Sequence, residues 1–422
     1  MLLLHLSDIH FRRTEISTVQ DPNFHLRNEL FRDVEEQCAR LGAPDAIIIS
    51  GDIAFAADPA EYEFATRWLT DLCTASGSSL ASVFVVPGNH DVVRAKADRN
   101  LVQMIHRQIK NANSPTAEVG KQLRDPDASR LLYESLDNYN QFALQFFCDL
   151  MPPDRTRAKR ELKLNDGSIL RLWGLNTAVV SSSADKQPDL FFDPASLQIT
   201  REHGVVNLVV AHHHLSWLRQ ARELEDHLND VAAIQVFGHV HTNRIEMNRD
   251  HVRLTASAAQ PDQHEAGWEP GYNLVELNVD GPPTERKLHI NAHVRVWQTA
   301  PGGFRAKTDK QSPVFTHSIN LEAWNSPPQS EVVSVRPEHQ ADTSIAMPIE
   351  GGPEMTTLRD LALRFYRLSF SKKSEIAGRL ELLEEEDMSL PDYERFRRVF
   401  IRAHERGRLE ALAKAVRNAE EG

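Results

Sequence analysis

Short apolar runs that end abruptly in polar residues are the main feature of the first half of the chain. Five runs show the pattern: Leu2–Leu6, Ala46–Ile49, Phe84–Val86, Val205–Val210 and Ala233–Phe237. Apolar runs of this length, rich in Val and Ile, predict buried β-strands. In open α/β sheets ligands bind beyond the carboxyl ends of the strands. We therefore expect the polar residues after the five runs to form a functional site.

Helical periodicity alternates with these runs. Leu26–Leu41 and Ala60–Ala75 carry apolar residues at helical spacing, and Pro59 favours a helix start at the second. The alternation from Met1 to about Gly271 predicts a layered α/β or α+β fold. A turn signal at Asn165–Ser168 predicts a hairpin. Three later segments alternate apolar and polar residues and are expected to form a second sheet that closes the domain: Tyr272–Val279, Leu288–Gln298 and Gly303–Thr308.

Changes of pattern divide the chain into three parts. Residues 1–324 are expected to form a catalytic domain that carries a helical insertion, or cap, at about 92–160. Residues 325–354 are rich in Pro, Ser, Gln and Gly and predict a flexible linker. Residues 355–422 show purely helical periodicity and predict a small all-α domain, with Ser371 as the cap of its second helix and Gly407 as the end of its third.

Composition limits the class of protein. The formal net charge of -12 argues against a chain that coats nucleic acid through bulk charge, but it does not exclude a nuclease. Apolar runs are too short to cross a bilayer, so we expect no membrane association. The three cysteines are widely spaced, which indicates buried thiols in a cytoplasmic protein.

The polar residues at the strand ends are of the types that bind metal ions. They are two carboxylates, one amide and four imidazoles: Asp8, His10, Asp52, Asn89, His212, His239 and His241. This mixture suits Mn, Fe, Zn, Co or Ni better than Ca or Mg alone. Seven ligands exceed the usual three protein ligands of a single catalytic ion. We therefore expect two divalent ions, Mn foremost, bridged by Asp52 and suited to in-line displacement at phosphorus.

These blocks resemble those of the calcineurin-like metallophosphoesterase family, in the family's order. They are Asp8-Ile9-His10, Gly51-Asp52, Gly88-Asn89-His90-Asp91, His212-His213 and Gly238-His239-Val240-His241. The resemblance implies a four-layer β-sandwich flanked by helices. It implies that Asp8, His10 and His241 hold the first metal, that Asn89, His212 and His239 hold the second, and that Asp52 bridges them. By the same resemblance His90 contacts phosphate or protonates the leaving oxygen, and Asp91 orients His90.

Two departures from the family pattern affect these expectations. Phe55 stands where the purple acid phosphatase branch has a metal-binding tyrosine, so we expect divalent, uncoloured metal. The fourth block reads His212-His213-His214, and either of the first two can be the ligand. His213, His214 and Arg12 are candidates for contact with the substrate. The alternative for the two histidines is a ring that only supports a metal ligand or lies at the surface, and for Arg12 an ordinary exposed loop arginine.

The resemblance favours hydrolysis of a phosphodiester by a metal-bridging hydroxide, close to the cyclic-nucleotide phosphodiesterase and repair-nuclease branches. The alternatives are a DNA or RNA nuclease effector of a bacterial antiphage defence system, a phosphomonoesterase, and a catalytically silent scaffold. Residues 355–422 loosely resemble the death-like adaptor domains of bacterial conflict systems. That resemblance implies a protein partner or self-association, whereas a plain helical bundle needs neither.

Overall fold

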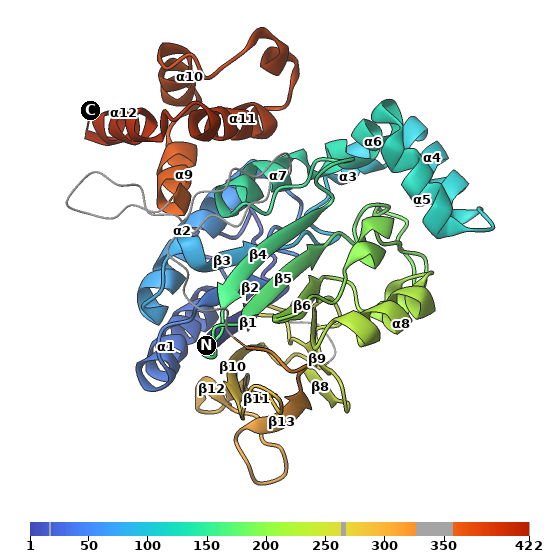
Figure 1. The fold of residues 1–422 in the computed structure, drawn as a ribbon, viewed down its shortest axis with the longest axis vertical. Coiled ribbons are helices and arrows are strands. Elements are labelled where there is room, and N and C mark those ends of the chain that lie inside the picture. The colour runs from blue at the N-terminus through green and yellow to red at the C-terminus, as the bar shows by residue number, and fades with distance from the viewer. Residues whose placement is uncertain (17, 263–266, 326–357, 422) are drawn as a thin grey trace.

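The computed structural model describes residues 1–16, 18–262, 267–325 and 358–421. The expected linker, 325–354, lies outside the described residues except for Asn325. Figure 1 shows two sheets at the centre, with helices on either side and a separate group of helices formed by the C-terminal residues.

The first sheet contains the N-terminal strand near its centre. Its strands follow the order β12-β11-β10-β1-β2-β3, and β13 also pairs with β11. Strands β1, β2 and β3 are parallel, while β10 runs antiparallel to β1. Their bounds are β1 Leu2–Leu6, β2 Ala46–Ile49, β3 Val83–Val85, β10 Gly271–Asp280, β11 Lys287–Thr299, β12 Gly302–Ala306 and β13 Phe315–Asn320. The parallel arrangement brings the ends of the first three strands to one edge.

The second sheet follows the order β4-β5-β6-β7-β9-β8. Strands β5, β6, β7 and β9 are parallel, with β4 and β8 antiparallel at the two edges. Their bounds are β4 Arg157–Lys163, β5 Ile169–Leu175, β6 Val205–Ala211, β7 Ile234–Phe237, β8 Arg244–Met247 and β9 Val252–Thr255. The hairpin predicted around Asn165–Ser168 is confirmed as the connection between β4 and β5.

Four layers result from the packing of helices on the outer faces of the sheets (Figure 1). Helices α1 (Phe24–Leu41) and α2 (Pro59–Ser76) cover the first sheet, and α8 (Ala221–Val231) covers the second. Along β6, Leu208 and Val210 face the core between the sheets, whereas Val209 packs under α8. A strand buried on both faces reads as a continuous apolar run, which explains the pattern of the sequence. The layered α/β expectation is confirmed.

The three late strands do not form a second sheet, contrary to expectation. Strand β10 pairs with β1, with Leu4 opposite Leu274, so β10, β11 and β12 extend the first sheet. The second sheet is built from β4 to β9 instead. Alternation along a strand reports which side chains are buried, but it carries no information about the neighbouring strand.

The insertion consists of five short α-helices on one flank of the sheets (Figure 1). They are α3 Arg94–Ala97, α4 Asn100–Lys110, α5 Pro115–Arg124, α6 Pro126–Tyr133 and α7 Asp137–Ala143, followed by a 3₁₀ helix at Leu144–Phe146. The expected end near residue 160 is wrong, because Arg157–Lys163 forms β4 and pairs with β5. The basic side chains of this segment mask its strand periodicity in the sequence.

Four helices form the C-terminal group: α9 Leu358–Arg367, α10 Phe370–Arg379, α11 Asp392–Glu405 and α12 Leu409–Glu421. Their apolar faces surround Phe365, Phe396 and Leu412, which are fully buried. The expected cap Ser371 is wrong by two positions. Helix α10 begins at Phe370, and the hydroxyl of Ser369 accepts a hydrogen bond from Lys372 N at 3.3 Å. Gly407 separates α11 from α12 as expected.

The C-terminal helices pack directly on the end of the insertion. Leu144 belongs to their apolar core. Asp149, whose side chain is fully buried, lies 2.6 Å from Arg155 Nη2 and 2.8 Å from Arg397 Nη1 of α11. Arg155 also contacts Glu394 at 2.7 Å. This buried ionic cluster joins the two parts of the chain.

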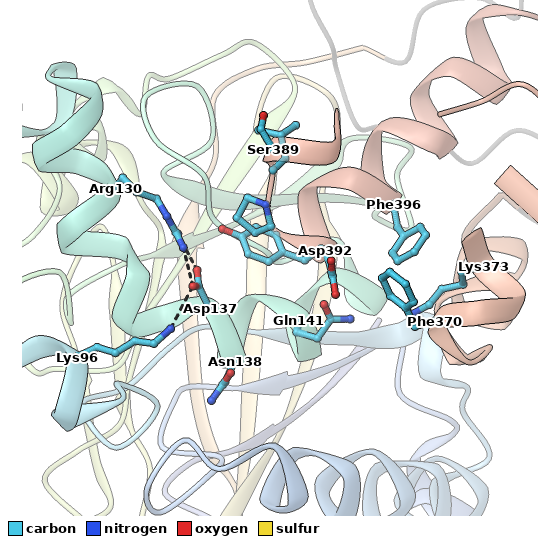
Figure 2. A pocket seen from close by; sticks show the side chains of 13 residues that line it. Lys96, Arg130, Asp137, Asn138, Gln141, Phe370, Lys373, Ser389, Asp392 and Phe396 are labelled. Atoms are coloured by element: carbon cyan, nitrogen blue, oxygen red, sulfur yellow. Dashed lines mark hydrogen bonds and ion pairs between the residues drawn. The ribbon is translucent and has the colours of Figure 1, made fainter. Parts of the chain in front are cut away.

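A cavity of about 630 Å³ lies where the insertion meets the C-terminal helices. Figure 2 shows Lys96 and Arg130 converging on Asp137, with Phe370 and Lys373 across the cavity. Arg130 Nη2 lies 2.7 Å and Lys96 Nζ 3.3 Å from the Asp137 carboxylate. Since Asp137 offsets these charges, the cavity presents no strong net positive charge. It lies apart from the residues at the strand ends.

None of the described helices is both long enough and apolar enough to cross a membrane.

Candidate metal centre

Polar residues from five strand ends meet at one edge of the two sheets. Asp8 follows β1 and Asp52 follows β2, and the N–H of Asp8 donates to the carbonyl of Gly51 at 3.1 Å. From the second sheet, Gly238 N donates to His212 O at 2.9 Å. The first bond fixes the turn after β1 to the turn after β2, and the second fixes the turn after β6 to the turn after β7. The convergence expected from the sequence is present.

The backbone at this edge is strained at candidate ligands. Non-glycine residues with positive φ include Asp8 (52°), His10 (52°), Asp52 (53°), His239 (69°) and His241 (52°). The left-handed conformation costs a non-glycine residue free energy and persists where surrounding structure enforces it. These conformations occur in the turns that carry Asp8 and His10, Asp52, and His239 and His241, so the strain is stored at the residues whose side chains form the donor groups.

The first group of donor atoms surrounds Asp8. Its Oδ1 lies 3.2 Å from His241 Nε2, and its Oδ2 accepts a hydrogen bond from His239 N at 3.0 Å. His10 Nε2 lies 3.1 Å from Asp52 Oδ2. The side chains of Asp8, His10 and His241 offer three ligand atoms within 4.8 Å of one another. This is the set expected for the first metal.

The second group surrounds the Asn89 side-chain oxygen. It lies 3.2 Å from His212 Nε2 and 3.1 Å from His213 Nε2. His239 Nδ1 lies 3.2 Å from His212 Nε2. Asp52 adjoins both groups, because its Oδ2 lies 3.3 Å from His212 Nε2 as well as near His10. Asp52 therefore lies between the two groups, within reach of both.

The donor set fits divalent cations. The Ser50 carbonyl can only accept, and His212 Nδ1 lies 2.8 Å from it, so Nδ1 carries the proton in the neutral ring. The bare Nε2 then faces the oxygens of Asn89 and Asp52, which are also acceptors. Acceptors turned toward one another repel unless a cation lies between them. Ligands bound to one ion at about 2.0–2.2 Å lie about 3 Å apart, as these atoms do.

Burial and charge act in opposite directions on the titrating groups of this cluster. Burial opposes the charged forms of Asp8 and Asp52, yet the neighbouring imidazoles outweigh it and hold the pKa of both carboxyls below the ordinary value. Burial also opposes protonation of His212, but the Asp52 carboxylate and its neighbours raise its pKa to about 9, so a proton on Nε2 competes with a metal ion for the same position. Burial, with the charge of His212, lowers the pKa of His239 to about 3. The cluster therefore favours anionic carboxylates beside positive charge.

Both adjacent histidines point their Nε2 atoms into the site. His213 Nδ1 lies 2.9 Å from the hydroxyl of Thr177, which fixes its ring as Ser50 fixes that of His212. His212 adjoins Asp52 and Asp8, whereas His213 groups with His212 and His239. The sequence left open whether His212 or His213 is the ligand. In the structure the two differ in position: His212 lies between the two groups, and His213 lies at the outer edge.

His90 is held differently from the expectation. Its Nδ1 lies 2.7 Å from the Phe55 carbonyl, and its ring packs on Phe55 at 5.0 Å between centroids. Asp91 does not orient it: the buried Asp91 carboxylate accepts hydrogen bonds from the backbone of Gly88 at 2.9 Å and Ala54 at 3.1 Å, and from Tyr62 OH at 2.9 Å. Adjacent side chains point apart here, because the chain turns between them. Asp91 therefore fixes the loops that carry His90 and Asp52.

Arg12 and His214, two of the residues expected to contact the substrate, lie in different parts of the site. Arg12 lines a cavity of about 310 Å³ beside His10, but its guanidinium lies 3.0 Å from Asp262 and 4.0 Å from the centroid of the Phe55 ring. His214 accepts a hydrogen bond from Ser216 N at 3.3 Å and caps the turn after β6. His214 belongs to none of the groups of possible metal ligands among the described residues.

Three residues that help to form the site were not predicted from the sequence. Thr177 follows the end of β5 and holds His213. It is a polar residue just after a strand, so the pattern that identified the other site residues also applies to it. Arg94 and Trp217 line a cavity with Asn89, His213 and His239. Both lie a few residues beyond a ligand block, in segments whose direction depends on the insertion and on the turn after β6. No local pattern in the sequence marks them.

Gly88 permits the close approach of two strand ends, and a methyl group there is expected to disrupt the site. A Cβ atom at Gly88 would lie 2.1 Å from Asp52 Oδ1 and 2.6 Å from Asp52 N. Gly88→Ala should weaken metal binding about 10- to 100-fold, the range seen when supports of a metal ligand are lost. Bound metal per chain, measured by mass spectrometry, tests this. Gly120→Ala, within helix α5 and with an ordinary 3.4 Å contact, is the matched control.

Comparison with known families and structures agrees with this geometry. The profile of the calcineurin-like phosphoesterases matches residues 1–243, and that of the GTPase-associated adaptor domain matches residues 357–418. An uncharacterised metallophosphoesterase-like protein of Bacillus subtilis, YydB, is 23% identical over 325 residues, which cover 73% of this chain and 63% of that protein. The glycerophosphodiester phosphodiesterase GpdQ of Enterobacter lignolyticus is 35% identical over 92 residues, 22% of this chain and 30% of that enzyme.

The chain thus spans less than two thirds of the length of these two relatives. Among solved structures, the purple acid phosphatase PPD1 of yellow lupin aligns with a TM-score of 0.39 at 12% identity, over 79% of this chain and 57% of that one. GAP50 of Plasmodium aligns with a TM-score of 0.39 at 13% identity, over 77% and 90% of the two chains. Neither a nuclease activity nor a defence role follows from these matches.

Proposed function

Because the chain belongs to the calcineurin-like phosphoesterase family, we propose that it is a metal-dependent hydrolase of phosphodiesters. Two divalent ions, Mn in the first place and otherwise Fe, Zn, Ni or Co, would be held by the two donor groups, with Asp52 shared between them. When bound, such a pair supplies a nucleophile from water near neutral pH and Lewis acids for the phosphate oxygens.

Cavities on both sides of the donor cluster favour a phosphodiester substrate over a phosphomonoester. The cavity of about 310 Å³ opens beside His10 and Arg12, and one of about 220 Å³ opens beside Asn89, His213 and His239. A phosphorus atom between these cavities can carry a substituent into each. A monoester fills only one of them and leaves the other to water.

His90 is the proposed proton donor to the leaving oxygen. In the neutral ring the Phe55 carbonyl fixes the proton at Nδ1, so Nε2 is free to hold a further proton on the side of His10 and Asp52. Burial lowers the pKa of His90 below its ordinary value, so the protonated ring is a stronger acid but a minor species at neutral pH. Asp91 acts through the backbone, by holding Gly88 and Ala54 in place.

Metal removal tests the proposed reaction directly. Dialysis of the full chain against a chelator is expected to abolish hydrolysis of bis-p-nitrophenyl phosphate, and added Mn should restore it. The same preparation should hydrolyse p-nitrophenyl phosphate, a monoester, with a lower kcat/KM. Diester hydrolysis that survives complete metal removal would contradict the metal requirement, and a preference for the monoester would contradict the diester assignment.

We further propose that the C-terminal helices bind a protein partner or a second copy of the chain. The match to an adaptor domain supports this role. Large exposed apolar side chains of this region also support it: Phe370 on α10, Ile401 on α11, and Met388 in the 3₁₀ helix Glu385–Ser389 between these two helices. Sedimentation of the full chain over a range of concentrations is expected to show an increase in mass that Met388→Lys suppresses. A constant monomer mass would exclude self-association and leave a different protein as the partner.

A further inference from the structure

The cavity beside the second donor group has walls from three separate parts of the chain. Asn89, His213 and His239 form its inner side. The opposite side is formed by residues from the insertion, from the loop after β5 and from the turn after β6: Arg94, Ser182, Ser183, Asp185, Leu190 and Trp217. The inner side belongs to the donor cluster, so a substituent of a phosphorus atom held at that cluster can extend into this cavity.

Trp217 gives this cavity an aromatic wall. Its ring centroid lies 4.2 Å from that of His239, at an interplanar angle of 89°. Its backbone carbonyl accepts a hydrogen bond from Leu190 N at 3.1 Å, which fixes the backbone at this position. The indole is half-buried and forms part of the cavity lining. An indole fixed in this way can stack on a flat ring without first being ordered.

Arg94 brings a positive charge to this cavity, where it acts on the Asp185 carboxylate without forming an ion pair with it. It is the first residue of α3, it is exposed, and within the described residues its guanidinium forms neither an ion pair nor a hydrogen bond. Arg12, on the other side of the cluster, is paired with Asp262 and Glu15 instead. An unpaired guanidinium next to a phosphate site is suited to phosphate or sugar oxygens.

The rim of the cavity is fixed in place. Ser183 N donates to Asp98 Oδ1 at 3.1 Å and thereby ties the loop after β5 to the insertion. Asp185 accepts hydrogen bonds from Ser181 Oγ at 2.7 Å and from Ser182 N at 2.8 Å. Acceptors and hydroxyls therefore lie at fixed positions between the aromatic wall and the cation.

We infer that this cavity binds the nucleoside group of a nucleoside phosphodiester, with the base on Trp217 and Arg94 on the sugar-phosphate oxygens. The inference rests on the proposed diester hydrolysis and specifies its substrate. A glycerol substituent has no ring to stack on the indole. A choline substituent would use the indole through its cation, but it would meet the positive charge of Arg94. A nucleoside can stack its base on the aromatic wall, place its sugar-phosphate oxygens near the cation, and donate its hydroxyls to the acceptors at the rim.

Two diesters with the same leaving group test the inference on the full, Mn-loaded chain. They are thymidine 5′-(p-nitrophenyl phosphate) and methyl p-nitrophenyl phosphate, which differ only in the nucleoside. The wild type is expected to show a kcat/KM at least about tenfold higher for the thymidine ester, since stacking of one base on an aromatic side chain has effects of this size. Trp217→Ala and Arg94→Ala should each remove most of that preference, mainly through KM.

Matched variants control for effects on folding. Trp217→Phe keeps an aromatic wall and should retain part of the preference. Arg107→Ala removes an exposed arginine of the same insertion that lies outside the cavity, and it should leave the preference unchanged. Calorimetric titration with thymidine 5′-monophosphate gives a readout independent of turnover. Trp217→Ala should weaken this binding about tenfold.

The outcomes distinguish failure of the proposed diester hydrolysis from failure of the proposed nucleoside site. If neither diester is hydrolysed, the proposed function fails. If both are hydrolysed with equal kcat/KM, or if the preference survives Trp217→Ala and Arg94→Ala, the nucleoside site is wrong and the diesterase stands. A short oligothymidylate distinguishes the source of the nucleoside. Cleavage that depends on Trp217 indicates a nucleic acid strand, and cleavage of the mononucleotide ester alone indicates a small nucleotide.

Discussion

Asp52→Asn is expected to lower kcat for bis-p-nitrophenyl phosphate by about 10³-fold or more. The substitution preserves shape but removes the negative charge shared by the two donor groups, where Asp52 Oδ2 lies 3.1 Å from His10 and 3.3 Å from His212. Loss of one ion position removes several kcal/mol of charge stabilisation in the transition state, and each 1.36 kcal/mol is tenfold in rate. Steady-state kinetics with added Mn measures the loss.

The amount of bound metal determines how that result is interpreted. Mass spectrometry of the Asp52→Asn protein should show fewer than two ions per chain, while circular dichroism shows an intact fold. Asp250→Asn, at a carboxylate that is 76% exposed, is the matched control and should keep both metal and activity. An Asp52→Asn protein with wild-type kcat would show that Asp52 does not bridge the ions. An inactive Asp52→Asn protein that keeps its biological effect would instead support a scaffold role for the chain.

Asp149→Asn is expected to destabilise the attachment of the C-terminal helices by about 3–5 kcal/mol. Asp149 is fully buried between Arg155 and Arg397, and Arg397 has a side-chain exposure of only 9%. Removing one partner of a buried ionic cluster leaves charge without compensation, which accounts for an effect of this size. Hydrogen exchange in α11, which reports the local free energy of opening, is the appropriate measurement for a chain with more than one domain.

An exposed ion pair provides the comparison for this second variant. Asp226 pairs with Arg222 at 3.8 Å, with exposures of 74% and 95%, so Asp226→Asn should change stability by less than about 1 kcal/mol. Unchanged protection of α11 in Asp149→Asn would contradict the inferred role of the cluster. In that case apolar contacts such as those of Leu144 would hold the helices in place.

The sequence by itself determined the elements and the chemical types of the site. Apolar runs such as Ala46–Ile49 identify strands because burial on both faces requires continuous hydrophobicity. The residues that follow each run, such as Asp52 and His239, could be named because parallel strands place their carboxyl ends at one edge. The apolar runs and the polar residues that follow them are neighbours in the sequence. They could therefore be identified without knowing which distant segments pack against them.

Only the tertiary structure decided which distant groups meet. Periodicity could not show that β10 pairs with β1, that Asp91 holds backbone rather than His90, or that Arg94 and Trp217 share a cavity. Each of these depends on the pairing of strands or on the direction of a loop between elements far apart in sequence. Such choices are set by the packing of the whole domain, whereas hydrophobic alternation reports only which side of its own element a residue occupies.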